Sequence, residues 1–210
     1  MLANIEVLCH NSIKISKEKI IYIDPFKIQK EYKDADIIMI THSHYDHFSE
    51  EDINKVKKEN TQICITKDLE ERTKNLGFRK ENIFIVEPNM KYKINEFEFE
   101  TILSYNISKQ FHPKENLWVG YIIKINNIIY YIAGDTDITE ENKKVMCDVA
   151  FLPVGGTYTM DSKEAAELAN IIKPKVAVPV HYGSIVGTKE DAENFKNMLD
   201  ESVKCEILIK

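Results

Sequence analysis

Short segments rich in isoleucine, valine, tyrosine and phenylalanine recur along the whole chain of 210 residues. Many of them alternate with polar residues at the two-residue period of a half-buried strand. The predicted strands cover residues 5–9, 13–16, 20–23, 36–40, 62–65, 83–86, 97–103, 119–125, 128–132, 148–152, 175–180 and 203–209. So many short strands must pair into sheets, and Asn126-Asn127 between two of them suits a tight hairpin turn, because asparagine tolerates positive φ.

Helix signals separate some of these strands. Ser49 is followed three residues later by an acid, which predicts a helix that begins after Ser49 and runs to about Lys58. Asp161 begins a second predicted helix, which ends before Pro174, and a third covers residues 189–199. We therefore predict two sheets packed together with helices on the outer faces. Because the chain shows no internal repeat, low-complexity tract or Gly/Ser linker, we expect one domain over residues 1–210.

The charge balance narrows the classes of partner. With 28 Lys+Arg and 34 Asp+Glu, the formal net charge is −6. Binding to nucleic acid or to an anionic membrane needs clustered basic residues. The nearest such cluster, Lys55, Lys57 and Lys58, is interleaved with acids, which is typical of a solvated helix face. We expect a small-molecule substrate and disfavour nucleic acid and membrane, while a homo-oligomer stays open.

The cysteines and the N-terminus indicate the compartment. Cys9, Cys64, Cys147 and Cys205 are far apart and form no C-x-x-C pair, so we expect reduced thiols. No basic segment followed by an apolar segment opens the chain, and no apolar run is long enough to span a bilayer. We predict a cytoplasmic protein.

The densest chemical signal is Thr41-His42-Ser43-His44-Tyr45-Asp46-His47, directly after the predicted buried strand 36–40. Imidazole and carboxylate are ligands of zinc and similar divalent ions. The spacing is too tight for two ligands one helical turn apart, so a loop-borne metal site fits better. A polar surface loop that is merely rich in histidine is the alternative.

Three later residues also follow predicted strands or lie in the connections between them. Asp135 follows strand 128–132, His181 follows strand 175–180, and His112 lies between strands 97–103 and 119–125. Ligands at the ends of separate strands can converge at one edge of a sheet. Each also has an ordinary alternative, Asp135 as a turn residue and the histidines as hydrogen-bonded loop residues.

In this order, Asp24, His42-x-His44-x-Asp46-His47, His112, Asp135 and His181 resemble the metallo-β-lactamase superfamily of metal-dependent hydrolases. The resemblance covers essentially the whole chain. It implies an α+β fold, a four-layer αββα sandwich of two mixed β-sheets. Three stretches are similar to the small single-domain members that include the ascorbate-6-phosphate lactonase-like group: Tyr22 to Phe26, Phe111 to Tyr121 and Pro153 to Asp161.

The resemblance implies two adjacent divalent metals, for which we expect zinc, with manganese or iron as alternatives. His42, His44 and His112 would hold the first, Asp46, His47 and His181 the second, and Asp135 would bridge both. Asp24 would then orient a ligand imidazole or the loop backbone, and His10 would either line the pocket or serve a plain structural role. Asn106 stands near His112 and complicates that assignment.

The implied reaction is hydrolysis of an ester-type bond, in a lactone, phosphodiester or thioester, by a hydroxide held between the metals. Asp46 and His181 would be catalytic as well as ligands, with Asp46 orienting the hydroxide. Tyr158, Tyr182 or Lys114 would donate to the developing oxyanion or to a substrate phosphate. Two dications, two carboxylates and a hydroxide leave a charge of about +1, which suits an anionic substrate or transition state.

Other members of the superfamily fit less well. Diiron redox proteins have a carboxylate where this chain has His44 and carry a flavin domain, and RNA-processing members add a second domain or an arm. From a different class, a metal-loaded sensor or binding protein without turnover remains the alternative. The complete ligand set argues against it.

Overall fold

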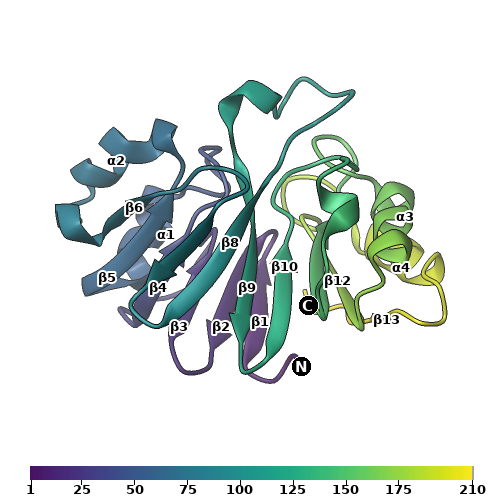
Figure 1. The fold of residues 1–210 in the computed structure, drawn as a ribbon, viewed down its shortest axis with the longest axis horizontal. Helices are drawn as coiled ribbons and strands as arrows, with labels where there is room; N and C mark the ends of the chain where they lie inside the picture. The colour runs from purple at the N-terminus through teal and green to yellow at the C-terminus, as the bar shows by residue number, and fades with distance from the viewer. Residues whose placement is uncertain (210) are drawn as a thin grey trace. The chain divides into compact units, whose positions relative to one another are not determined.

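The computed structural model describes residues 1–209 and divides the chain into two compact units, Leu2–Glu87 and Pro88–Leu208, here called the N-terminal and C-terminal units. Each unit contains one mixed β-sheet and two α-helices (Figure 1). This confirms the predicted α+β class with two mixed sheets; the structure has four α-helices where the sequence predicted three. The four-layer packing and the single domain stay predictions.

The N-terminal sheet has the strand order β1-β2-β3-β4-β5-β6. Its strands are β1 (Ile5–Cys9), β2 (Ser12–Ser16), β3 (Ile20–Ile23), β4 (Ala35–Met39), β5 (Lys57–Ile65) and β6 (Ile83–Ile85). The first three pair antiparallel, and β3 to β6 pair parallel. Because the carboxyl ends of parallel strands meet at one sheet edge, the segments after β3 and β4 lie together. These segments begin at Asp24 and Ile40.

Helices α1 (Glu50–Val56) and α2 (Glu70–Asn75) belong to the same unit. The predicted Ser49 cap of α1 is confirmed, because its side chain accepts a hydrogen bond from the backbone N–H of Asp52. Ile53 and Val56 of α1 pack on Ile38 and Ile63 of the sheet in one buried core. Burial of this apolar face holds α1 on the sheet, and so fixes the chain that leads into it.

The C-terminal sheet has the order β13-β12-β11-β10-β9-β8-β7. Its strands are β7 (Lys91–Ile94), β8 (Phe97–Leu103), β9 (Val119–Ile125), β10 (Ile128–Ile132), β11 (Val149–Pro153), β12 (Val176–Val180) and β13 (Lys204–Cys205). Strands β7 to β10 pair antiparallel, and β10 to β13 parallel. The carboxyl ends of β10, β11 and β12 therefore meet at one edge.

Turns and helices in this unit follow local sequence. Asn126 and Asn127 have φ of 50° and 60° in a two-residue hairpin between β9 and β10, as predicted. Helix α3 (Ser162–Ile172) begins at a capping box of Asp161 and Glu164. It packs against β11, while α4 (Lys189–Asn197) packs against β12. In Figure 1 the two helices lie side by side.

The prediction of a strand over residues 203–209 is wrong in extent, since β13 covers only Lys204–Cys205. Residues 176 and 180 of β12 hydrogen bond on the β11 side, so residues 177 and 179 face β13. Ala177 accepts from the N–H of Glu206, but Pro179 has no N–H to donate, and the ladder ends there. Two short elements, β7 and α2, were not predicted. Strand β5 begins at Lys57, whereas the prediction began it at Gln62.

Among residues 1–209, no helix is both long and apolar enough to cross a membrane.

Candidate metal centre

Eight side chains are candidate metal ligands in the described part of the chain. In the N-terminal unit they are His10, His42, His44, Asp46 and His47, and in the C-terminal unit they are His112, Asp135 and His181. All are buried except His44, which is partly exposed. The set includes each ligand predicted from the sequence and adds His10.

Asp24 organises the N-terminal group. It directly follows β3, and both of its carboxylate oxygens accept hydrogen bonds in a fully buried position. Oδ1 accepts from the backbone N–H of Thr41, at 2.8 Å. Oδ2 accepts from Asn11 Nδ2 at 2.8 Å, from Thr41 Oγ1 at 2.7 Å and from His47 Nδ1 at 2.7 Å. An ionised carboxylate only accepts, so His47 carries its proton on Nδ1 and turns the lone pair of Nε2 away from Asp24.

Thr41 extends this control to His42. Its single hydroxyl proton goes to Asp24, so its oxygen is left to accept from His42 Nδ1 at 3.0 Å. Nε2 of His42 then presents a lone pair, and it lies 3.1 Å from Nδ1 of His44. Two imidazole nitrogens of the H-x-H pair therefore point at one place, as a shared metal requires.

Asp46 brings two further imidazoles together. Its Oδ2 lies 3.4 Å from Nε2 of His47 and 3.3 Å from Nε2 of His10. His10 is fully buried in the turn between β1 and β2 and has a φ of 54°. The sequence left its role open between pocket and structure, and the structure places it against a predicted ligand.

Asp135 is the centre of the C-terminal group. Its Oδ2 lies 3.2 Å from Nε2 of His112 and 3.0 Å from Nε2 of His181. The three residues follow β10, β8 and β12 respectively, at the edge where strand ends meet. Ser104 Oγ lies within hydrogen-bond distance of the carbonyl oxygens of Ala133 and Asp135 and so ties this turn to the end of β8.

Asn106, which complicated the assignment of His112 in the sequence, holds that histidine in place. Its Oδ1 accepts from Nδ1 of His112 at 2.9 Å and from the His112 backbone N–H at 3.1 Å. Its Nδ2 donates to Asp137 Oδ1 at 3.1 Å and to the carbonyl of Tyr158 at 3.0 Å. The proton of His112 is thereby fixed on Nδ1, and the lone pair of Nε2 faces Asp135.

His181 sits in a strained turn. Its φ is 60°, a region that residues other than glycine rarely adopt, and Asp24 shares this property with a φ of 45°. Gly155 packs so closely on the turn that a Cβ there would lie 2.4 Å from the His181 carbonyl oxygen. Such strain persists only where surrounding contacts enforce it, which is common at functional sites.

Tyr158 and Tyr182, the two tyrosines predicted to line the pocket, have different environments. The ring of Tyr158 lies edge-on to Phe111, with centroids 4.6 Å apart, and so joins the loop that carries His112. Tyr182 is fully buried, and burial together with the charges of Cys205 and Glu193 raises its pKa to about 12. Its role as a donor to substrate stays a prediction.

The structure also identifies site residues that the sequence analysis did not single out. Asn11, Thr41 and Asp137 hydrogen bond to Asp24, His42 and Asn106 and so orient them. Their sequence signal is weak, because polar residues in loops are common. Thr41 was recoverable in part, since it opens the histidine-rich motif.

The donor set fits divalent metals. In His47 and His112 a lone pair on Nε2 faces a carboxylate oxygen, at 3.4 Å and 3.2 Å. Two acceptors at that separation repel each other, and buried carboxylates are costly to desolvate. A cation between them removes both penalties, and imidazole with carboxylate is a ligand set that zinc, manganese and iron accept.

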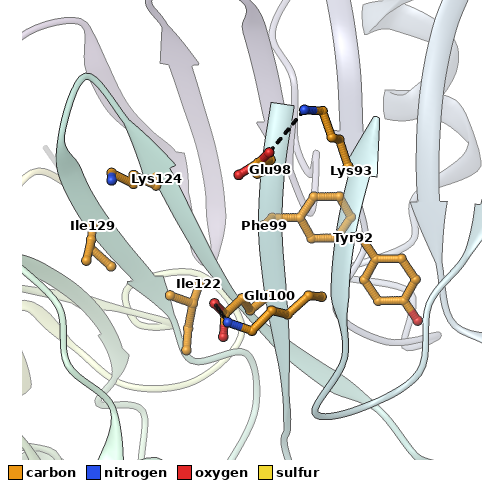
Figure 2. Close-up of a pocket in the computed structure, with 9 residues that line it drawn as sticks. Tyr92, Lys93, Glu98, Phe99, Glu100, Ile122, Lys124 and Ile129 are labelled. Carbon is orange, nitrogen blue, oxygen red and sulfur yellow. Dashed lines mark ion pairs between the residues drawn. The ribbon is translucent and has the colours of Figure 1, made fainter. Parts of the chain in front are cut away.

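A hollow elsewhere in the C-terminal unit is lined by other residues (Figure 2). Tyr92, Phe99, Ile122 and Ile129 form part of its wall on β7 to β10. Its charges are neutralised across strands, because Lys93 pairs with Glu98 at 3.1 Å and Lys91 with Glu100 at 2.9 Å. We interpret it as a solvated sheet surface.

Comparisons with known proteins agree with the fold and with a metal-dependent hydrolase. Residues 4–181 match the family model described as "Beta-lactamase superfamily domain". A UPF0173 metal-dependent hydrolase of Pyrococcus furiosus is 28% identical over 224 residues, which cover 99% of this chain and 96% of that protein.

Two solved structures share the fold over nearly the whole chain. A protein of Parabacteroides distasonis, described as a candidate metal-dependent hydrolase, is 30% identical with a TM-score of 0.81, covering 97% of this chain and 91% of its own. Igni18, a metallo hydrolase of Ignicoccus hospitalis, is 21% identical with a TM-score of 0.78, covering 97% and 93%. Since the family model spans most of its length, this chain belongs to the β-lactamase superfamily.

Proposed function

We propose that this chain, a metal-dependent hydrolase of the metallo-β-lactamase fold, cleaves an ester-type bond in a small molecule with the help of two divalent metals. Zinc is the metal we expect first, with manganese or iron as alternatives. The ester classes in question are lactones, phosphodiesters and thioesters. We also propose that the enzyme works in the cytoplasm, which its four free cysteines suit.

The proposed ligand sets draw on both units. One metal would be held by His42, His44 and His112, and the other by Asp46, His47 and His181. Asp135 would bind both.

The observation that carries this proposal is the environment of Asp135. One carboxylate oxygen lies close to Nε2 of both His112 and His181, and Asn106 fixes the His112 lone pair toward it. A buried carboxylate that faces two imidazole nitrogens in this way suits a bridging metal ligand better than a turn residue.

Two bound dications would supply a water with a pKa lowered toward neutrality and a positive charge that polarises the oxygen of the scissile group. The residues of the chain position the reaction. Asp24 and Asn106 hold the imidazoles in the required tautomer, and Asp46 is placed to orient the attacking water. With two carboxylate ligands the site favours a substrate or a transition state that carries negative charge.

Metal content and hydrolysis, measured on the same samples, test the proposal. Purified protein is stripped with a chelator, reloaded with zinc, manganese or iron, and assayed on a lactone, a thioester and a phosphodiester. Asp135→Asn should lose metal and turnover together. Asp161→Asn is the matched control, because Asp161 is exposed and asparagine also caps helices well.

Two outcomes would overturn the proposal. Full metal content and normal turnover in Asp135→Asn would refute the bridging role. Two bound metals without turnover in any of the three classes would instead favour a metal-binding sensor.

A further inference from the structure

The loop between β8 and β9, residues 104–118, presents apolar side chains to solvent beside a candidate ligand. Ile107 is 65% exposed, Phe111 is 45% exposed and Leu117 is 55% exposed, whereas His112 of the same loop is buried. In Figure 1 this loop projects beyond the ends of both strands. Large apolar side chains exposed in the loop that carries a candidate ligand are candidates for contact with a bound molecule.

The loop that exposes these apolar side chains is held by several hydrogen bonds. Asp137 accepts from the backbone N–H of Ile107 at 2.9 Å and of Ser108 at 3.4 Å, and from Lys109 Nζ at 2.6 Å. The backbone of Asn106 also donates to the carbonyl of His112 at 2.8 Å. The loop is thus anchored at several points while it keeps these apolar groups outside.

Leu117 adds a sign that the conformation is imposed. Its φ is 54°, in the left-handed region, where a Cβ crowds the backbone. The neighbouring Trp118 is buried with its ring 5.6 Å from that of His112. Leu117 ends the 3-10 turn Lys114–Asn116 as its left-handed C-cap, and its backbone N–H donates to the Lys114 carbonyl oxygen at 3.2 Å.

The cations of the loop are already neutralised. Lys109 lies between Asp137 and Glu164, at 2.6 Å and 3.6 Å. Lys114 lies 3.3 Å from Glu141 and stands over the ring of Tyr105, 4.5 Å from its centroid. A phosphate group would have to displace these carboxylates, whereas an uncharged apolar group would not.

We propose that Ile107, Phe111 and Leu117 form an apolar rim, which binds the acyl or aryl group of the substrate. Resting on the function proposed above, this narrows the substrate to uncharged carboxylic esters, lactones or thioesters of apolar acids. The oxygen of water bonds to the carbonyl carbon as the acyl–oxygen or acyl–sulfur bond breaks. One water proton goes to the leaving alcohol or thiol, and the other is released when the acid ionises.

The experiment compares chain length across variants of the metal-loaded enzyme. The first measurement is the ratio of kcat/KM for p-nitrophenyl octanoate to kcat/KM for p-nitrophenyl acetate. Bis-p-nitrophenyl phosphate is assayed as the phosphodiester, and metal content is measured on the same samples. In the parent enzyme this ratio should be about 10 or more, because the rim would bury part of the longer acyl chain of the octanoate. Ile107→Ser and Phe111→Ser should lower it at least threefold, mainly through KM, with metal content unchanged.

Two further variants secure the interpretation. Leu117→Gly removes the side chain and relieves the positive φ, so it tests the rim without a folding penalty. Ile171→Ser is the matched control, because Ile171 is 42% exposed on α3, and its ratio should equal that of the parent.

The outcomes separate the two proposals. The rim proposal is overturned if esters are hydrolysed with no preference for chain length, or if parent and rim variants show the same ratio. Either result is still compatible with an ester hydrolase. Preference for the phosphodiester would also overturn the rim proposal. If Phe111→Ser instead abolished a dimer seen by sedimentation and left the ratio unchanged, the rim would be a self-interface. Failure to hydrolyse any of the substrates with both metals bound would refute the proposed function itself.

Discussion

At the scale of single residues, the candidate centre depends on hydrogen bonds that fix which nitrogen of each imidazole carries the proton. Asp24 and Asn106 do this for His47 and His112, one with a carboxylate and the other with an amide. Both side chains are buried, and each also makes hydrogen bonds to other residues. Asp24 must gather donors from three side chains, while Asn106 must accept from a histidine and donate to a carboxylate.

Asp24→Asn should lower metal affinity about 10- to 100-fold. The amide has one acceptor oxygen, so its NH2 must face either the Thr41 backbone N–H or the three side-chain donors on Oδ2, and the orientation of His47 is weakened. Affinity is measured by competition with a chromophoric chelator. Asp36→Asn, a partly exposed carboxylate in the same unit, serves as control. Equal affinity in both variants would contradict the role of Asp24.

Asn106→Asp should destabilise the protein by about 3 kcal/mol, because it sets a second buried carboxylate against Asp137 and removes the donor between them. Adding Asp137→Asn exchanges the amide and the carboxylate, and leaves Lys109 with one partner. The double variant should recover at least half of the loss and regain metal binding. Urea unfolding of all four proteins measures the coupling, and strictly additive losses would rule it out.

At the scale of elements, strand ends place the candidate ligands, and short polar links hold neighbouring strands in register. Asp148, just before β11, accepts from the backbone N–H of Ile129 in β10 at 2.8 Å. It also pairs with Lys175, just before β12, at 2.8 Å. One carboxylate thus ties three parallel strands together at the edge opposite the ligand-bearing ends.

The hydrogen bonds from Lys175 and from the Ile129 backbone lower the pKa of Asp148 below its usual value. A lowered pKa contributes stability above the unfolded pKa, near 3.9, and that contribution is lost as the pH falls through the folded pKa. Asp148→Asn should therefore cost about 1 kcal/mol at pH 7 and nothing at the acid end of the curve. Urea unfolding of metal-free protein from pH 7 to pH 3 checks this, with Lys175→Met expected to behave alike. A pH-independent difference would exclude it.

At the scale of the whole molecule, the chain forms two compact units, each with a mixed sheet and each with part of the candidate ligand set. Under the proposed function, each unit contributes candidate metal ligands. Metal binding would then be coupled to the stability of each unit, since the unfolded chain offers no preformed site.

Removal of metal should lower the melting temperature by about 10 °C, equivalent to about 4 kcal/mol of binding energy at a free metal concentration 1,000 times Kd. The loaded protein should unfold in one transition, and chelation should separate it into two. Differential scanning calorimetry with and without chelator tests this, and magnesium at the same ionic strength is the control. An unchanged profile would show that the metals do not link the units.

The seven predicted ligands came from the resemblance to a family and not from any local pattern. The sequence by itself determined the strands with strong local patterns, the helix caps at Ser49 and Asp161 and the Asn126-Asn127 turn. These depend on side-chain period, capping chemistry and spacing, which are local properties. Tertiary structure decided the rest. Pro179 shortened β13 through a missing N–H on the side that faces it, and His10 joined Asp46 because a turn buried it there. Asn106 and Asp137 became positioning residues only through a hydrogen bond between residues 31 apart in the sequence. Which way a loop side chain faces depends on what packs around it, and no local pattern encodes that.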